Sequence, residues 1–209
     1  MNALLLKDLV NLKRSFKMLI FIVAIFGIIF IPTGGLAGFL CILMFIAVSL
    51  TINSLAYDNI AEWDEYALTM PISRKDIVSA KYRLLIMFIA CGFIISIAFI
   101  AALYFALPQL FAEFVNPFIQ TVIVFCVGII LGSVMLPITY KFGTEHARYI
   151  MIIVMIFFGI IVGASLFLFS EMIPSINSIL FTILFFAVSL IALLLSWIIS
   201  NKIYANKEF

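Results

Sequence analysis

Charged residues are scarce in this sequence. Asp, Glu, Lys and Arg together make up 11% of the 209 residues, against roughly 25% in an ordinary soluble domain. Apolar residues, counting Tyr and Cys among them, make up 67%, against about 45–50% in such a domain. These proportions exclude a water-soluble globular protein. The net charge of +2 also argues against a nucleic-acid binder, because such a protein must neutralise many phosphates.

Residues that build common catalytic and metal sites are also few. The three cysteines, Cys41, Cys91 and Cys126, lie in apolar stretches without metal-ligand spacing, so they predict neither disulfides nor a zinc site. The P-loop pattern G-x-x-x-x-G-K-[ST] is absent, which excludes a nucleotide site of that type. We therefore expect no catalytic, cofactor-binding or metal-ligating residues in this chain. The one histidine, His146, is interpreted either as a solvated loop residue or as a pH-sensing or partner-contacting one.

Long uncharged apolar runs dominate instead. Six are present, at residues 18–31, 36–56, 84–107, 118–140, 149–169 and 179–199. Five contain 21 to 24 residues, enough for a helix to cross a bilayer core of about 30 Å. The first contains only 14, so it either extends toward Leu12 with snorkelling lysines or is re-entrant, and we favour the span. A cleaved signal peptide is disfavoured, because the preceding basic region is 17 residues long and no A-x-A site follows.

The basic residues predict the orientation of the chain. All twelve lie before the first run, between runs two and three, between runs four and five, or after the sixth. Because Lys and Arg concentrate on the cytoplasmic side of membranes, both termini are predicted to be cytoplasmic. The expected fold class is an all-α membrane protein with six transmembrane helices. Residues 1–17 would form an amphipathic N-terminal helix, and residues 18–209 the transmembrane domain.

The N-terminal segment carries an apolar stripe opposite its basic residues. The stripe consists of Leu5, Leu9, Leu12 and Phe16. Such a helix is expected to lie in the inner membrane interface, either as an elbow that flanks the first span or simply as an anchor.

The six runs contain no Asp, Glu, Lys, Arg or His. Proton-coupled pumps and most secondary transporters keep such groups near the middle of the membrane. Their absence argues against a carboxylate-based carrier and against an intramembrane hydrolase. A sodium site made of backbone carbonyls and hydroxyl groups stays open, with Ser49, Thr51 and Asn53 as candidates.

The longest connection between runs, residues 57–83, is predicted to carry a function. An apolar series recurs there at helical spacing, at Ile60, Trp63, Ala67 and Met70. An acidic series recurs beside it, at Asp58, Glu62 and Glu65. The acidic face should look into the cytoplasm or at a protein, because anionic lipid would repel it. The segment is either a solvated surface helix or a docking site with Trp63 and Tyr66 as aromatic anchors.

A capping box is predicted after this segment. Ser73 and Asp76 have the S-x-x-[DE] spacing that starts a helix. We therefore expect a helix to begin at Arg74 and to continue through residues 81–83 into the third run. A displacement of residues 58–70 would then reach a membrane helix through a rigid junction.

Two spans contain the pattern G-x-x-x-G, which lets helix backbones approach closely. The pairs are Gly128 with Gly132 and Gly159 with Gly163. They serve either packing within the chain or an interface between subunits. Pro137 is expected to kink the fourth span.

Two stretches resemble the cytoplasmic signatures of small ABC-2 type permeases. The first is EWDEY at residues 62–66, followed by TMPISRKDIV at residues 69–78 and by Lys81-Tyr82. The second is PITYKFG at residues 137–143, with Arg148-Tyr149. The six runs and the basic N-terminal segment extend the similarity over essentially the whole chain. The resemblance includes permeases that export amphipathic or antimicrobial peptides, such as phenol-soluble modulins.

This resemblance implies the membrane subunit of an ATP-driven exporter in a bacterial cytoplasmic membrane, moving an apolar or amphipathic cargo. Its partners would be separate ABC ATPase subunits, which hold the ATP and Mg²⁺, and a second copy or a paralogue of the permease. Residues 58–70 would be the coupling helix that seats in the ATPase. Two rival functions stay open: an ATPase-independent carrier or pore, and a membrane assembly factor.

Three groups of residues are predicted to take part. Contacts with the ATPase are expected at Asp58, Glu62, Trp63, Asp64, Glu65, Tyr66 and Met70. The lever is expected to begin at Ser73, Arg74, Lys75 and Asp76. A secondary contact is expected at Lys141, Glu145, His146 and Arg148.

Overall fold

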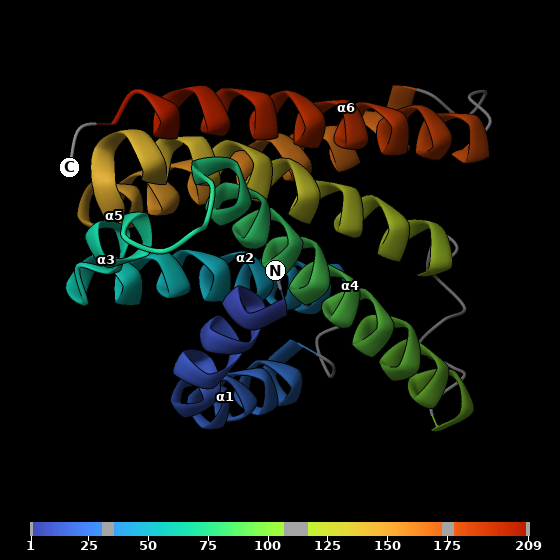
Figure 1. Ribbon diagram of the computed structural model, residues 1–209. Coiled ribbons are helices and arrows are strands. Elements are labelled where there is room, and N and C mark those ends of the chain that lie inside the picture. Colours follow the sequence, from blue (N-terminus) through green and yellow to red (C-terminus); the bar gives the residue numbers. More distant parts are fainter. Residues whose placement is uncertain (1, 31–35, 107–116, 173–177, 208–209) are drawn as a thin grey trace.

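The computed structural model describes residues 2–30, 36–106, 117–172 and 178–207. Every regular element among them is a helix, which confirms the all-α prediction (Figure 1). The helices are α1 (Asn2–Phe30), α2 (Leu36–Ile60), α3 (Trp63–Leu68), α4 (Arg74–Ala106), α5 (Pro117–Met172) and α6 (Ser178–Ala205).

Four helical stretches are long and apolar enough to cross a membrane. They are Gly38–Ile60, Arg74–Phe105, Phe118–His146 and Leu180–Ala205. The shortest has 23 residues, which at 1.5 Å per residue exceeds the roughly 30 Å of a bilayer core. These stretches contain the whole fourth predicted run and all but one or two residues of the second, third and sixth.

The first and fifth predicted runs are not among these four stretches. The first run contains only a shorter apolar helix, Leu19–Ile28. The side chains of residues 155–169, most of the fifth run, lie outside the described part of the structure. The count of six spans therefore stays a prediction.

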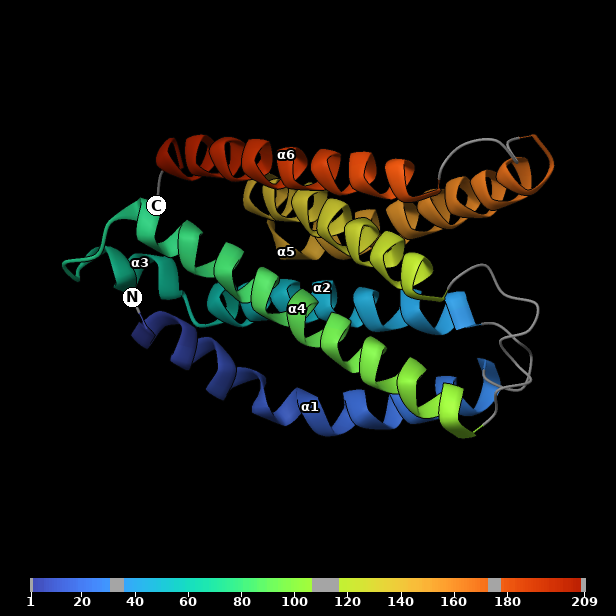
Figure 2. The same cartoon turned by 90° about the vertical axis from the view of Figure 1, so that its right-hand side faces the viewer.

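Helix α1 joins the N-terminal segment to the first run. It continues from Asn2 to Phe30 without a helical break at residue 17, the predicted boundary between the amphipathic helix and the transmembrane domain. Figures 1 and 2 show that it changes direction part-way along. The expected elbow and the first apolar run are thus parts of one helix.

Helix α5 consists of two arms that meet at Gly143. This glycine has φ 80° and ψ 168°, whereas the backbone on both sides is helical. A positive φ strains residues that have a Cβ atom, so glycine suits this position. Figures 1 and 2 show the chain turning back here. Pro137, where a kink is predicted, lies inside the first arm, and the non-helical residue Gly143 comes six residues later.

Helix α2 lies at the centre of the structure. It contacts α1, α3, α4 and α5, and 67% of its most apolar window is buried, against 11% for α6. The outer surface of α6 carries large exposed apolar side chains such as Ile183, Leu194 and Ile198. An apolar surface of this kind is suited to lipid and unsuited to water.

The first glycine pair packs within the chain. A Cβ atom on Gly128 would lie 3.2 Å from the Cβ of Met44 in α2, and one on Gly132 would lie 2.7 Å from both terminal methyl carbons of Leu85 in α4. These distances favour the intramolecular interpretation of this pair. Gly159 and Gly163 lie in the second arm of α5, and their surroundings fall outside the described residues.

The segments between the long helices gather at one end of the structure. Figure 2 shows the two chain ends and α3 at the same end of the molecule. Asn59 at the end of α2 donates a hydrogen bond to Thr144 beside the Gly143 turn, at 3.2 Å. The four predicted cytoplasmic segments therefore share one end, and its placement in the cytoplasm stays a prediction.

Candidate partner-docking site

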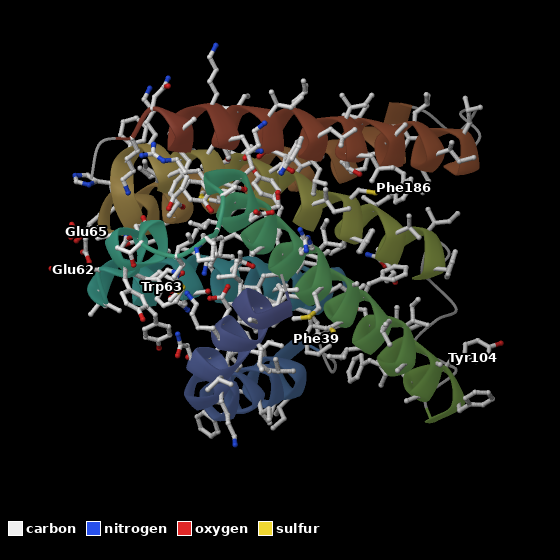
Figure 3. All side chains as sticks on the ribbon, viewed as in Figure 1. Phe39, Glu62, Trp63, Glu65, Tyr104 and Phe186 are labelled. Carbon is white, nitrogen blue, oxygen red and sulfur yellow. The ribbon has the colours of Figure 1, made fainter. Side chains whose placement is uncertain are left out.

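Helix α3 has an outward and an inward face. Glu62, Glu65 and Tyr66 are exposed, whereas Ala67 is completely buried. In Figure 3 the Glu62 and Glu65 side chains lie at the outer edge of the molecule and Trp63 lies further in. Neither glutamate forms an ion pair with any residue that the structure describes. The two carboxylates are thus open to a partner.

The predicted faces of this segment need a correction at two residues. Asp58, expected on the acidic face, is only 5% exposed, and Ile60, expected on the apolar face, is 80% exposed. The reason is that α2 ends at Ile60 and Glu62 adopts the left-handed conformation, with φ 48° and ψ 34°. Helical spacing therefore does not continue from Asp58 to Trp63. Asp58 belongs to the buried end of α2 rather than to the exposed face of α3.

The inward side of α3 forms a hydrogen bond and an ion pair with residues at the end of α6. The hydroxyl of Tyr204 donates a hydrogen bond to Oδ1 of Asp64 at 3.0 Å, and the Lys207 amine lies 3.5 Å from Oδ2. Asp64, predicted to contact a partner, is thus engaged within the chain. Its contacts hold α3 against the C-terminal end of α6.

The start of α4 is fastened to the same end of α6. Nη1 of Arg74 donates to the carbonyl oxygen of Ala205 at 2.7 Å, and more weakly to those of Tyr204 and Lys207. Carbonyls at a helix C-terminus lack partners inside the helix, and a cation there also suits the helix dipole. The predicted lever residue Arg74 therefore ties α4 to α6.

The predicted capping box is present. The Ser73 backbone N–H donates to Oδ2 of Asp76 at 3.3 Å, and the Asp76 N–H donates to Oγ of Ser73 at 3.2 Å. Helix α4 begins at Arg74 with Lys75 exposed in its first turn, and it continues to Ala106 without a break. Half-buried Met70 lies in the short turn before it, where its carbonyl accepts from the Ile72 N–H at 2.7 Å.

On its other side, α3 contacts α1 through Trp63. The amine of Lys7 lies 4.1 Å from the centroid of the indole ring, within the range of a cation–π interaction. The Tyr66 ring lies 5.6 Å from the Trp63 ring. Trp63, predicted as a partner anchor, is only half-buried and also supports the exposed Tyr66.

An open hollow lies beside α3. Its volume is about 200 Å³, and its lining residues are Asp58, Asn59, Glu62, Asp64, Glu65 and Lys207. Asp58 is paired with Lys7 and Lys81, and Asp64 with Lys207, so Glu62 and Glu65 give the hollow its net negative charge. This charge lies at the outer side of the hollow, so a partner with basic side chains would fit there.

Four charged side chains form a buried cluster where α1, α2 and α4 meet. Lys81 Nζ lies 2.8 Å from Asp8 and 2.6 Å from Asp58, and Lys7 Nζ lies 3.4 Å from Asp8 and 2.5 Å from Asp58. Ser54 accepts a further hydrogen bond from Lys81 at 2.6 Å. Each lysine thus bridges both carboxylates, and the cluster has no net formal charge.

Sequence reasoning missed this cluster, although the sequence held a signal for it. Asp8 lies on the same stripe as Leu5 and Leu12, three and four residues away, where an apolar helix face would exclude a lone carboxylate. Lys81 likewise falls between Val78 and Leu84, both fully buried. A charge placed among apolar neighbours predicts a buried partner of opposite sign.

Comparison with known proteins now adds to this geometry. The family described as ABC-2 family transporter protein matches residues 3–205. The chain belongs to this family. No curated protein and no solved structure gives a significant match.

Membership makes this ABC-2 protein a multi-pass membrane transport subunit that works with ABC ATPase partners. Its predicted site residues divide into two groups. Glu62, Glu65 and Tyr66 are exposed, whereas Asp58 and Asp64 are engaged in contacts within the chain.

The predicted secondary contact of the ABC-2 subunit lies on both sides of the Gly143 turn. Lys141, Glu145 and His146 are exposed there. The side chain of Arg148 lies outside the described part of the structure. The Asn59–Thr144 hydrogen bond places this turn at the same end as α3, so one partner could meet both surfaces.

Proposed function

We propose that the exposed face of α3 is the surface on which this ABC-2 subunit docks its ATPase. The observation that carries the proposal is the division of α3 into two faces: Glu62, Glu65 and Tyr66 point outward, while Trp63 and Asp64 contact α1 and α6. A segment exposed on one side and fastened on the other can receive a displacement and pass it to the membrane helices.

The chemistry of the outward face defines the partner surface. Two glutamates beside an acidic hollow attract a basic surface, which speeds encounter and sets the register of docking. Tyr66 adds a large aromatic side chain, of the type that contributes strongly to interface affinity. The ATPase should therefore present Lys or Arg around an apolar recess. Lys141, Glu145 and His146 would form its secondary contact.

The transport function follows from this docking. Two copies of the subunit, or one copy and a paralogue, would enclose a pathway through which an apolar or amphipathic cargo, such as a peptide, leaves the cytoplasm. ATP and Mg²⁺ would bind in the ATPase, and both termini of this chain would face the cytoplasm of a bacterial cell. The apolar helices and the family resemblance support this proposal.

Charge reversal tests the docking surface. The double variant Glu62→Lys/Glu65→Lys should still insert into the membrane, but ATP-hydrolysing activity should no longer copurify with it in mild detergent. The matched control is Lys202→Glu, which changes an exposed charge at the end of α6. ATPase activity that copurifies equally with the wild type and the double variant would contradict the proposal.

A further inference from the structure

Lys7 takes part in two contacts at once. Its amine pairs with Asp58 in the buried charge cluster and also lies over the Trp63 ring of α3. Its side chain is 22% exposed, whereas the other three members of the cluster are 7% exposed or less. Lys7 is thus the member through which the buried cluster reaches α3.

We propose that Lys7 is a positioning residue that makes α1 part of the transmission from α3. When α3 is displaced, Trp63 moves with it and displaces Lys7 through their cation–π contact. Because Lys7 is paired within the charge cluster, α1, α2 and α4 then move together. This inference rests on the proposed function, because the ATPase is what displaces α3.

The cluster is built to move as one unit. Lys81 has three N–H donors, and its amine lies within hydrogen-bond distance of Asp8, Asp58 and Ser54. Each carboxylate also contacts Lys7. Separating any one member would leave a buried charge without compensation, which is strongly unfavourable. Moving the three helices together avoids that penalty.

The alternative path runs along the chain itself. Residues 69–73 lead from α3 into the capping box of α4, so a displacement that used this path alone would act on α4 first. Helix α1 would then not need to follow α3. The two paths therefore differ in whether α1 and α3 keep a fixed distance during the ATPase cycle.

The experiment measures that distance by electron paramagnetic resonance. Spin labels would be placed at Val10 on α1 and Thr69 at the end of α3, both exposed, after Cys41, Cys91 and Cys126 are replaced by alanine. The full-length chain would be measured in its complex with the copurifying ATPase, without nucleotide and after trapping with ATP and vanadate.

We expect one narrow distance distribution in both states for the unmodified Lys7. Lys7→Met should broaden it and make it shift on trapping, and Lys7→Arg should restore the narrow distribution, since a guanidinium can both pair and stack. Lys13→Met is the matched control, because it removes an exposed lysine from the same helix. If Lys7→Met destabilises the chain, Trp63→Leu should give the same broadening with all four charges retained.

Two results would overturn the inference. One is a distance between the two labels that shifts on trapping as much in the protein with Lys7 as in the Lys7→Met variant. The other is a distance that stays narrow and fixed in both Lys7→Met and Trp63→Leu. Failure of the proposed function looks different, because no ATPase would then copurify with the wild type. The distance distributions of the wild type and of Lys7→Met would still be compared in the isolated chain.

Discussion

The hydroxyl of Tyr204 and the carboxylate of Asp64 form a hydrogen bond of 3.0 Å between residues 140 positions apart in the sequence. This bond joins α3 to α6. Together with the contact of Lys7 with Trp63, it places α3 between the first and the last helix of the chain. This short helix of six residues therefore contacts Lys7 in α1 on one side and Tyr204 in α6 on the other.

Removing the Tyr204 hydroxyl should weaken this junction. Hydrogen bonds to charged groups contribute about 1.5–3 kcal/mol, so we expect Tyr204→Phe to lower the free energy of unfolding by an amount in this range. Denaturation in detergent, followed by circular dichroism, measures the change. Tyr149→Phe is the control, because Tyr149 is largely exposed. Equal stabilities of the two variants would contradict the assignment.

The charge cluster should respond differently to single and paired substitutions. Lys81→Met leaves the Asp8 and Asp58 carboxylates with too little compensation, which we expect to cost about 3–5 kcal/mol of unfolding free energy. The double variant Lys81→Met/Asp58→Asn removes one charge of each sign and should lose less than the sum of the two single variants. Additive losses in the denaturation experiment would exclude the coupling.

The glycines of α4 and α5 should tolerate alanine unequally. A Cβ on Gly132 would lie 2.7 Å from buried Leu85, so Gly132→Ala should lower stability by about 1–3 kcal/mol through overpacking. A Cβ on Gly92 would lie 3.6 Å from the nearest atom of Met44, an ordinary contact. Gly92→Ala should therefore be neutral or stabilising, because alanine favours the helix. Thermal unfolding of both variants in one detergent makes the comparison.

Glu62 allows charge and backbone effects to be separated. Its left-handed conformation costs an ordinary residue about 1 kcal/mol, and glycine avoids this cost. Glu62→Gly should therefore raise the unfolding temperature while it weakens binding of the ATPase. A variant that is more stable and binds equally well would remove Glu62 from the docking surface.

Local patterns in the sequence were sufficient for part of this structure. The capping box at Ser73 and Asp76 involves residues three apart, so its spacing alone predicts the start of α4. The apolar runs predict the long helices for a similar reason, because composition over about 20 residues decides whether a helix suits the membrane.

Other features depend on contacts that spacing does not encode. The left-handed residue at 62 is a glutamate, whereas glycine or asparagine usually marks such a helix end. The amphipathic pattern therefore predicts one helix across the break. Arg74 and Asp64 find their partners more than 130 residues away in the sequence. Only the packed structure shows that these two residues act within the chain.

Burial also determines how salt acts on this assembly. Dissolved ions reach exposed charges such as Glu65 but hardly reach Asp8 or Lys81, whose side chains are at most 3% accessible. We therefore expect a wash at high ionic strength to release the ATPase from this subunit. The subunit itself should stay folded and able to bind fresh ATPase.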